Sequence, residues 1–141
     1  MVLLLLEMIT VLGNFSSPKV EEFVISRGNI LELWRLDENN SINVVCSYEV
    51  YGLIRSLKSF RLSGILIYLV LFAGNDVDFV LIGSDSGRIV VLQFNEERNV
   101  FVKIHQETYG KVGVIRGLPG QYISVDPNGR AFMISLLVYS I

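Results

Sequence analysis

Cysteine and histidine are nearly absent from this sequence. The 141 residues include one of each, Cys46 and His105. A single cysteine cannot form a disulfide within the chain, which fits a reducing compartment. The two residues together cannot supply the four ligands of a structural zinc site, so we expect no metal.

Charge is also scarce. Charged residues make up 18% of the chain, the formal net charge is −2 and the pI is about 5.4, whereas 51% of the residues are hydrophobic. A chain of this composition can bury a core and is too apolar to be disordered. The charge balance offers no broad basic surface to the phosphates of a nucleic acid.

Two apolar stretches are too short or too irregular for a membrane segment. Residues 65–73, ILIYLVLFA, form the longer uninterrupted run, but spanning a bilayer takes about 20 residues. The N-terminal run lacks the positive start of a signal peptide and is interrupted by Glu7. We expect no membrane contact, and we interpret residues 1–12 as an atypical N-terminal strand or an artefact of the gene model.

One phrase recurs three times: an apolar run, a polar turn and a second apolar run. The copies are FVISRGNILELWRL (23–36), FVLIGSDSGRIVVLQF (79–94) and YISVDPNGRAFMISLL (122–137). Gly28, Gly87 and Gly129 mark the turns, where glycine adopts a positive φ at little cost, and Pro127 presets the φ of its position. Each copy predicts a β-hairpin.

The hairpin arms are nearly continuous in apolar residues, which is typical of strands covered on both faces. Further strands are predicted in 41–50, 53–62 and 100–110, and no stretch shows a sustained helical period. With an insert around 65–74 set aside, the hairpins recur at roughly the 40–50 residues of a four-stranded propeller blade. We predict an all-β fold, a partial β-propeller of about two to three blades that belongs to a larger domain.

No catalytic constellation stands out. The segment Gly83–Gly87 differs from a nucleophile elbow, which needs serine in the middle position and a following helix. There is no phosphate loop and no dinucleotide fingerprint. A small hydrolase built around Ser84, Asp85 or His105 is an alternative that the sequence leaves open. The main expectation is a protein that is not an enzyme, with no catalytic residue, no cofactor and no small-molecule substrate.

Arginine recurs beside the hairpin glycines, at Arg27, Arg88 and Arg130. If the hairpins repeat around a propeller, these three residues fall on corresponding positions of one rim. Arginine at a rim suits the recognition of carboxylate or phosphate groups. The three are therefore candidate interaction residues, and ordinary solubility of exposed turns is the alternative.

Six segments carry a family resemblance. In chain order they are GNFSS, VISRGNILEL, YGLIRSLKSFRLSG, GSDSGRIVVLQF, KIHQETYGK and PGQYISVDPNGRAFMIS. From about Gly13 to Ser135 the chain resembles the N-terminal part of the splicing factor 3b subunit 3 family. It is less similar to two related families, the large subunits of the damaged-DNA-binding complex and of the cleavage and polyadenylation specificity factor.

The resemblance implies a nuclear, non-catalytic scaffold of several propellers, with residues 13–141 as the N-terminal part of the first. It implies support of branch-site recognition in pre-mRNA splicing through protein–protein contacts. The implied partners are the other splicing factor 3b subunits, including the helical-repeat largest subunit, with RNA contacted mainly indirectly. The alternatives are a propeller adaptor of a cullin ubiquitin ligase in DNA repair and a subunit of a 3′-end processing factor.

The family pattern passes from the equivalent of Gly64 almost directly to that of Asp78, whereas ILIYLVLFAG (65–74) intervenes here. Gly64-Ile65 can be encoded GGT-ATT and Ala73-Gly74 can be encoded GCA-GGN, a plausible intron start and end. One hypothesis is that residues 65–74 translate an unspliced short intron, and a genuine loop insertion is the alternative. Reading transcripts across these codons separates the two.

Overall fold

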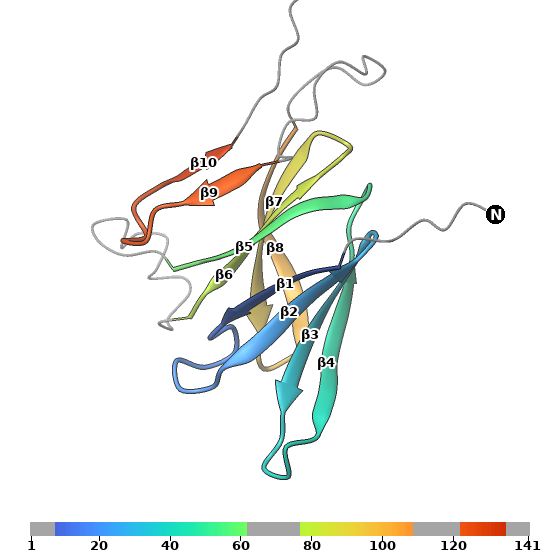
Figure 1. Ribbon diagram of the computed structural model, residues 1–141, viewed down its shortest axis with the longest axis vertical. Helices are drawn as coiled ribbons and strands as arrows, with labels where there is room; N and C mark the ends of the chain where they lie inside the picture. The colour runs from blue at the N-terminus through green and yellow to red at the C-terminus, as the bar shows by residue number, and fades with distance from the viewer. Residues whose placement is uncertain (1–7, 62–76, 109–121, 135–141) are drawn as a thin grey trace, which may run out of the picture.

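The computed structural model describes residues 8–61, 77–108 and 122–134, and in these ranges the chain forms ten β-strands and no helix (Figure 1). The strands make two four-stranded sheets and one two-stranded sheet. These ranges accordingly contain no helix that could cross a membrane. The all-β prediction is confirmed.

The first sheet takes its strands in chain order. They are β1 (Met8–Gly13), β2 (Glu22–Arg27), β3 (Ile30–Leu36) and β4 (Ile42–Glu49). All neighbours are antiparallel, and the register places Leu12, Phe23, Trp34 and Val44 in one cross-strand row. Because directly paired residues point to the same face, these four side chains share one face of the sheet.

The second sheet repeats this order. Its strands are β5 (Ile54–Phe60), β6 (Phe79–Ser84), β7 (Arg88–Asn95) and β8 (Val100–Thr108). β5 and β6 pair up to Phe60 opposite Phe79, and β6 and β7 pair with Ile82 opposite Val90. Both predicted hairpin arms and the predicted flanking strands are therefore present in each of the two sheets.

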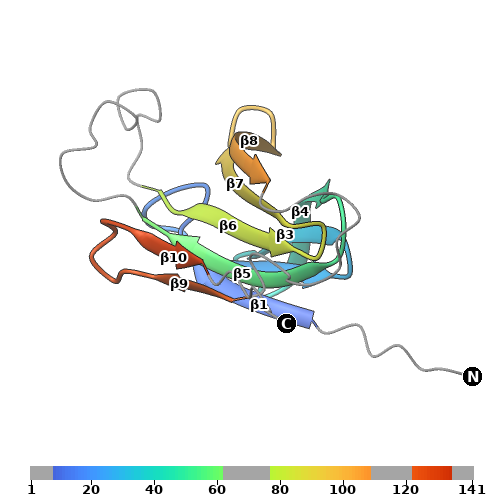
Figure 2. The same ribbon diagram turned by 90° about the horizontal axis from the view of Figure 1, so that it is seen from above.

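The third sheet consists of β9 (Ile123–Val125) and β10 (Phe132–Ile134). The first strands of the three sheets are neighbours in space, since β1 contacts β5 and β5 contacts β9. Figures 1 and 2 show β9 and β10 against the second sheet, on the opposite side from β3 and β4. Sheets laid side by side through their first strands are the arrangement of propeller blades.

The three predicted turns are confirmed at their glycines. Gly28, Gly87 and Gly129 have φ values of 64°, 76° and 66°, in the region that side chains other than glycine and asparagine rarely adopt. In the second and third turns the glycine N–H donates to the carbonyl three residues earlier, at 3.1 Å to Ser84 and 2.9 Å to Asp126. The similar turn sequences thus fold into similar turns.

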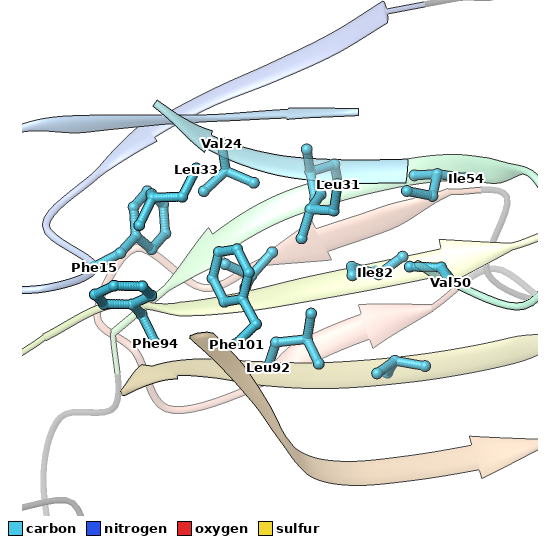
Figure 3. Packing of buried hydrophobic residues seen from close by; sticks show 13 residues of the cluster. Phe15, Val24, Leu31, Leu33, Val50, Ile54, Ile82, Leu92, Phe94 and Phe101 are labelled. Atoms are coloured by element: carbon cyan, nitrogen blue, oxygen red, sulfur yellow. The ribbon is translucent and has the colours of Figure 1, made fainter. Parts of the chain in front are cut away.

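The main core lies between the first two sheets. Leucine, valine, isoleucine and phenylalanine side chains from both sheets meet there (Figure 3), and the buried cluster includes Phe15, Val24, Leu31, Leu33, Val80, Ile82, Val90, Leu92, Phe94 and Phe101. A smaller cluster of Leu81, Ile89 and Ile123 joins the second sheet to the third. The second sheet therefore has apolar contacts on both faces.

The prediction that all hairpin arms are covered on both faces is correct for the second sheet and wrong for the first and the third, where β9 and β10 also have exposed residues. All six residues of β6 are buried. In β2 buried and half-buried residues alternate, and Leu12 and Val44 in the row described above are 51% and 54% exposed. One face of the first sheet is therefore open to solvent at these residues, which explains the alternation.

Several predictions fall on residues outside the described ranges. The segment 65–74, with its two interpretations, is one of them, as are residues 1–7. β1 begins at Met8, inside the segment that the sequence marked as an atypical N-terminal strand. The boundary at residue 12, the extent of the propeller part over 13–141 and the origin of the insert all stay predictions.

Candidate protein-interaction site

Two hairpin turns and one connection come together at one end of the first two sheets. The connection between β4 and β5, residues 50–53, forms backbone hydrogen bonds with the β2–β3 turn and with the β6–β7 turn. Val50 N–H donates to Asn29 O at 2.8 Å, and Asp85 N–H donates to Leu53 O at 2.9 Å. Ile54 N–H donates to Gly28 O at 2.9 Å. We call this end of the sheets the connection rim.

Side chains of the β6–β7 turn fix the conformation of the connection. The hydroxyls of Ser84 and Ser86 both donate to the carbonyl of Tyr51, each at 3.0 Å. The carboxylate of Asp85 accepts from Leu53 N–H at 2.8 Å. Gly52 has a φ of +87°, and a Cβ at this position would lie 2.6 Å from the Asp85 Oδ1 atom. Only glycine fits here, because any side chain would meet both strain and a steric clash.

The fixed backbone presents an aromatic side chain to solvent. Tyr51 is 70% exposed. The guanidinium of Arg88, the first residue of β7, lies over its ring with the Cζ atom 4.3 Å from the ring centroid. A guanidinium over an aromatic face is held by cation–π attraction. The pair thus forms an ordered surface feature at the connection rim.

The predicted interaction residues have different surroundings. Arg27, the last residue of β2, bonds Glu32 at 2.6 Å. Burial raises the pKa of the Glu32 carboxyl, but hydrogen bonds from Trp34 and Arg27 outweigh it and hold that pKa below its usual range. The Arg88 guanidinium lies over the Tyr51 ring. Both arginines lie at the connection rim, because each flanks a turn that contacts residues 50–54.

Arg130 lies at the opposite end of the sheets. Phe132, just beyond the β9–β10 turn, makes an edge-to-face contact with Phe60 at the far end of β5, with ring centroids 5.9 Å apart. Figure 1 shows the same: the β9–β10 turn is on the left, whereas the β2–β3 and β6–β7 turns are on the right. The placement of all three arginines on one rim is therefore wrong for Arg130.

The physical reason is the strand position of the third hairpin. β9 lies beside β5, as β5 lies beside β1, so β9 is the first strand of its sheet. Its turn thus corresponds to the connection between first and second strands, whereas the other two turns join second and third strands. Antiparallel neighbours reverse direction at each turn, so these two kinds of turn lie at opposite ends of a sheet. Whether any of the three arginines binds a partner stays a prediction.

Arg130 interacts with its own turn. Its Nε donates to Asp126 Oδ2 at 2.7 Å. This bond, followed by the backbone N–H of Asn128, lowers the pKa of the Asp126 carboxyl. The arginine therefore stabilises the carboxylate of the turn that carries it.

Among the residues that the structure describes, the groups of the hydrolase alternative do not assemble into one site. The Ser84 hydroxyl is bound to the Tyr51 carbonyl, and the Asp85 carboxylate is bound to a backbone N–H. His105 is exposed on β8, with its Nε2 atom 3.2 Å from Glu107. Burial raises the pKa of the Cys46 thiol to about 11, so the reactive thiolate is scarce at neutral pH. Each group is thus engaged separately.

The described ranges also contain no group of three or more histidine, cysteine, aspartate or glutamate side chains that could hold a metal ion. What the connection rim offers instead is an exposed aromatic ring, an arginine over that ring and a backbone fixed by hydrogen bonds from both turns. Tyrosine and arginine are the residue types enriched at the energetic centres of protein interfaces. This arrangement suits binding of another macromolecule.

The family model described as the RSE1/DDB1/CPSF1 first beta-propeller matches residues 9–140. The chain belongs to this family. The family match and the three sheets agree on a β-propeller fold, so the predicted fold class and the predicted resemblance are both confirmed.

Individual members of the family share much of the sequence. Spliceosome-associated protein 130 A of Arabidopsis thaliana is 52% identical over 122 residues, which cover 86% of this chain and 9% of that protein. Splicing factor 3B subunit 3 of Danio rerio is 50% identical over 123 residues, covering 86% and 9%. Pre-mRNA-splicing factor RSE1 of Mycosarcoma maydis is 42% identical over 136 residues, covering 92% and 10%. The chain spans about a tenth of the length of these relatives.

Sequence reasoning missed Tyr51 and its pairing with Arg88. Tyr51 lies in the connection between β4 and β5, Arg88 is the first residue of β7, and no sequence periodicity connects the two. Gly52 was the available signal, since a glycine between two predicted strands marks a connection with unusual backbone angles. That signal locates the turn but says nothing about which side chain the turn exposes.

Proposed function

We propose that this chain is a non-catalytic scaffold segment of the splicing factor 3b complex. In this proposal it supports branch-site recognition in pre-mRNA splicing, in the nucleus, through protein–protein contacts. The observation that carries the proposal is identity of 42–52% over most of the chain to proteins named as splicing factors and spliceosome-associated proteins. The proposed partners are the other subunits of that complex, including the helical-repeat largest subunit.

Two features of the chain support a scaffold role. The described side chains are organised around packing and backbone hydrogen bonds, and the candidate catalytic groups are engaged apart from one another. The net charge of −2 also favours protein contacts over direct binding to the RNA backbone, which calls for clustered lysine and arginine. We therefore propose that RNA is contacted mainly indirectly.

A second candidate follows from the family description, which also names DDB1 and CPSF1. In that case the chain would serve as a propeller adaptor of a cullin ubiquitin ligase in DNA repair, or as part of a 3′-end processing factor. The high identity to splicing proteins favours the first proposal. The three functions differ in the proteins that accompany the chain, so they can be separated biochemically.

The test is purification of the protein from its own cells, with an affinity tag added to the chromosomal gene. We expect the other splicing factor 3b subunits in amounts comparable to the tagged protein. A matched preparation with Val80→Asp, which puts a charge at a fully buried position, should capture none of them. Recovery of a cullin or of 3′-end processing subunits instead would overturn the splicing proposal.

A further inference from the structure

We propose that Tyr51 and Arg88 form a docking point for an acidic segment of a partner protein. The Arg88 guanidinium would bind one carboxylate of that segment, and the Tyr51 ring would pack against an apolar side chain beside it. The inference rests on the proposed scaffold function and adds to it the surface used and the chemistry of the segment bound. Its first support is the state of the Arg88 side chain.

Among the described residues, the partner of Arg88 is an aromatic ring, whereas the neighbouring arginines at this rim are paired with carboxylates. Arg27 bonds Glu32 at 2.6 Å, and Arg55 lies 3.8 Å from Asp85. The guanidinium carbon of Arg88 lies 4.3 Å from the centroid of the Tyr51 ring, and its N–H donors have no hydrogen-bond or ion-pair partner among the described residues. This leaves Arg88 able to form the paired hydrogen bonds that arginine makes with carboxylates.

The site is ordered before a partner arrives. The two serine hydroxyls hold the Tyr51 carbonyl, Asp85 holds the N–H of Leu53, and Gly52 allows the turn between them. Binding energy is lost when loops and side chains must be ordered at an interface, so a preformed site keeps more of it. Leu53, 40% exposed beside Tyr51, extends the apolar surface.

A protein segment fits this site better than RNA. A single arginine with no described carboxylate partner matches one carboxylate, whereas sequence-independent RNA binding uses several phosphate contacts. We therefore commit to a partner segment with one acidic residue next to an apolar one.

The experiment uses the tagged protein and measures the ratio of splicing factor 3b subunits to tagged protein in washed complexes. We expect Arg88→Glu to lower this ratio about tenfold and Tyr51→Ala to lower it several-fold, as for residues at the centre of an interface. The matched controls are Arg98→Glu and Tyr122→Ala. Tyr122 is 61% exposed, and Arg98 is exposed in the β7–β8 turn, beyond the other end of β7 from Arg88, so neither should change the ratio.

A second measurement looks for a gain of signal instead of a loss of binding, so a folding defect cannot imitate the expected result. A photo-crosslinking amino acid in place of Tyr51 should couple to a splicing factor 3b protein, and one in place of Tyr122 should not. Coupling to RNA alone, or no coupling from position 51, would overturn the inference. So would equal losses in the test and control variants.

The two proposals fail in different ways. If the wild-type protein brings down no splicing subunit, the proposed function is wrong and the docking inference falls with it. If the wild-type protein brings them down and the Tyr51 and Arg88 variants do so equally well, the proposed function stands and the docking point alone is wrong.

Discussion

The first and second sheets share one strand order and one connectivity, but they differ in what covers them. The second sheet packs against the first on one face and against β9 and β10 on the other, and every residue of β6 is buried. The first sheet packs on one face, while Leu12, Phe23, Trp34 and Val44 line the other. Position in the stack, more than sequence pattern within a strand, decides how much of a sheet is buried.

The two sheets are also stabilised differently at their ends. In the first sheet a fully buried carboxylate, Glu22, accepts hydrogen bonds from the N–H groups of Phe15 and Ser16, at 3.2 and 2.9 Å. Arg35 bonds the same carboxylate at 2.8 Å. In the second sheet the central strand depends on apolar packing. The comparison predicts that charge removal affects the first sheet most and cavity formation the second.

The largest effect is expected for Glu22→Ala. Removing this carboxylate leaves Arg35 and two backbone N–H groups unpaired, so the free energy of unfolding should fall by about 3–5 kcal/mol. The adjacent Glu21 is exposed, and Glu21→Ala should change it by less than about 0.5 kcal/mol. Urea denaturation of both variants measures the difference. Similar changes in the free energy of unfolding for the two variants would show that the buried carboxylate stabilises the fold no more than an exposed one does.

A pair of identical substitutions compares the sheets directly. Leu81 in β6 is 1% exposed, whereas Leu12 in β1 is largely exposed. Leu81→Ala should lower the free energy of unfolding by about 2–5 kcal/mol, because it removes buried atoms and leaves a cavity. Leu12→Ala should change it by about 0.5 kcal/mol or less. A large loss at Leu12 would mean that the open face is covered in solution.

The connection between the sheets should tolerate little change at Gly52. Gly52 has a positive φ and lies close to the Asp85 carboxylate. Gly52→Ala should therefore lower the free energy of unfolding by about 1–3 kcal/mol. Combining it with Asp85→Ala removes the nearest clashing atom and leaves the Cβ and N atoms of Ser86 at 3.1 Å. The double variant should then be more stable than the sum of the single effects predicts, as a double-mutant cycle measures. Strict additivity would argue against the clash.

The smallest effect is expected in the third sheet, at the Asp126–Arg130 pair. The pKa of Asp126 is held below its usual value in the folded state. Its contribution to stability is therefore present above the unfolded pKa, about 3.9 for an aspartate, and is lost as the pH falls through the lower folded pKa. NMR titration should show this pKa rising in Arg130→Ala. An unchanged titration would show that the ion pair does not persist in solution.

Local turn chemistry made the three hairpins predictable. Glycine at 28, 87 and 129 between apolar runs is a short-range signal, and short-range signals survive folding when nothing opposes them. The coverage of each arm was less predictable. β2 and β6 are both rich in apolar residues, yet only β6 has sheets on both of its faces. The sequence of a strand does not determine which sheets pack against its two faces.

The rim assignment failed for a related reason. The turns at 84–88 and 126–130 have the same chemistry, but one joins the second and third strands of a sheet and the other joins the first and second. A tight turn satisfies the same backbone requirements in either place, so its sequence does not reveal the end of the sheet at which it lies. The Tyr51–Arg88 contact was hidden likewise, because it joins the β4–β5 connection to the first residue of β7, 37 positions further along the chain.

The ladder between β5 and β6 has a practical consequence. It extends to Phe60 opposite Phe79, and just beyond it Arg61 Nε bonds Asp78 Oδ1 at 2.7 Å. The two ends of the intervening segment are thus fastened together by the fold on either side. Lengthening a closed loop costs only about 0.6 kcal/mol for each doubling of its length. The segment between Arg61 and Asp78 should therefore accept an inserted foreign peptide, such as an epitope tag or a protease site, while both sheets stay folded.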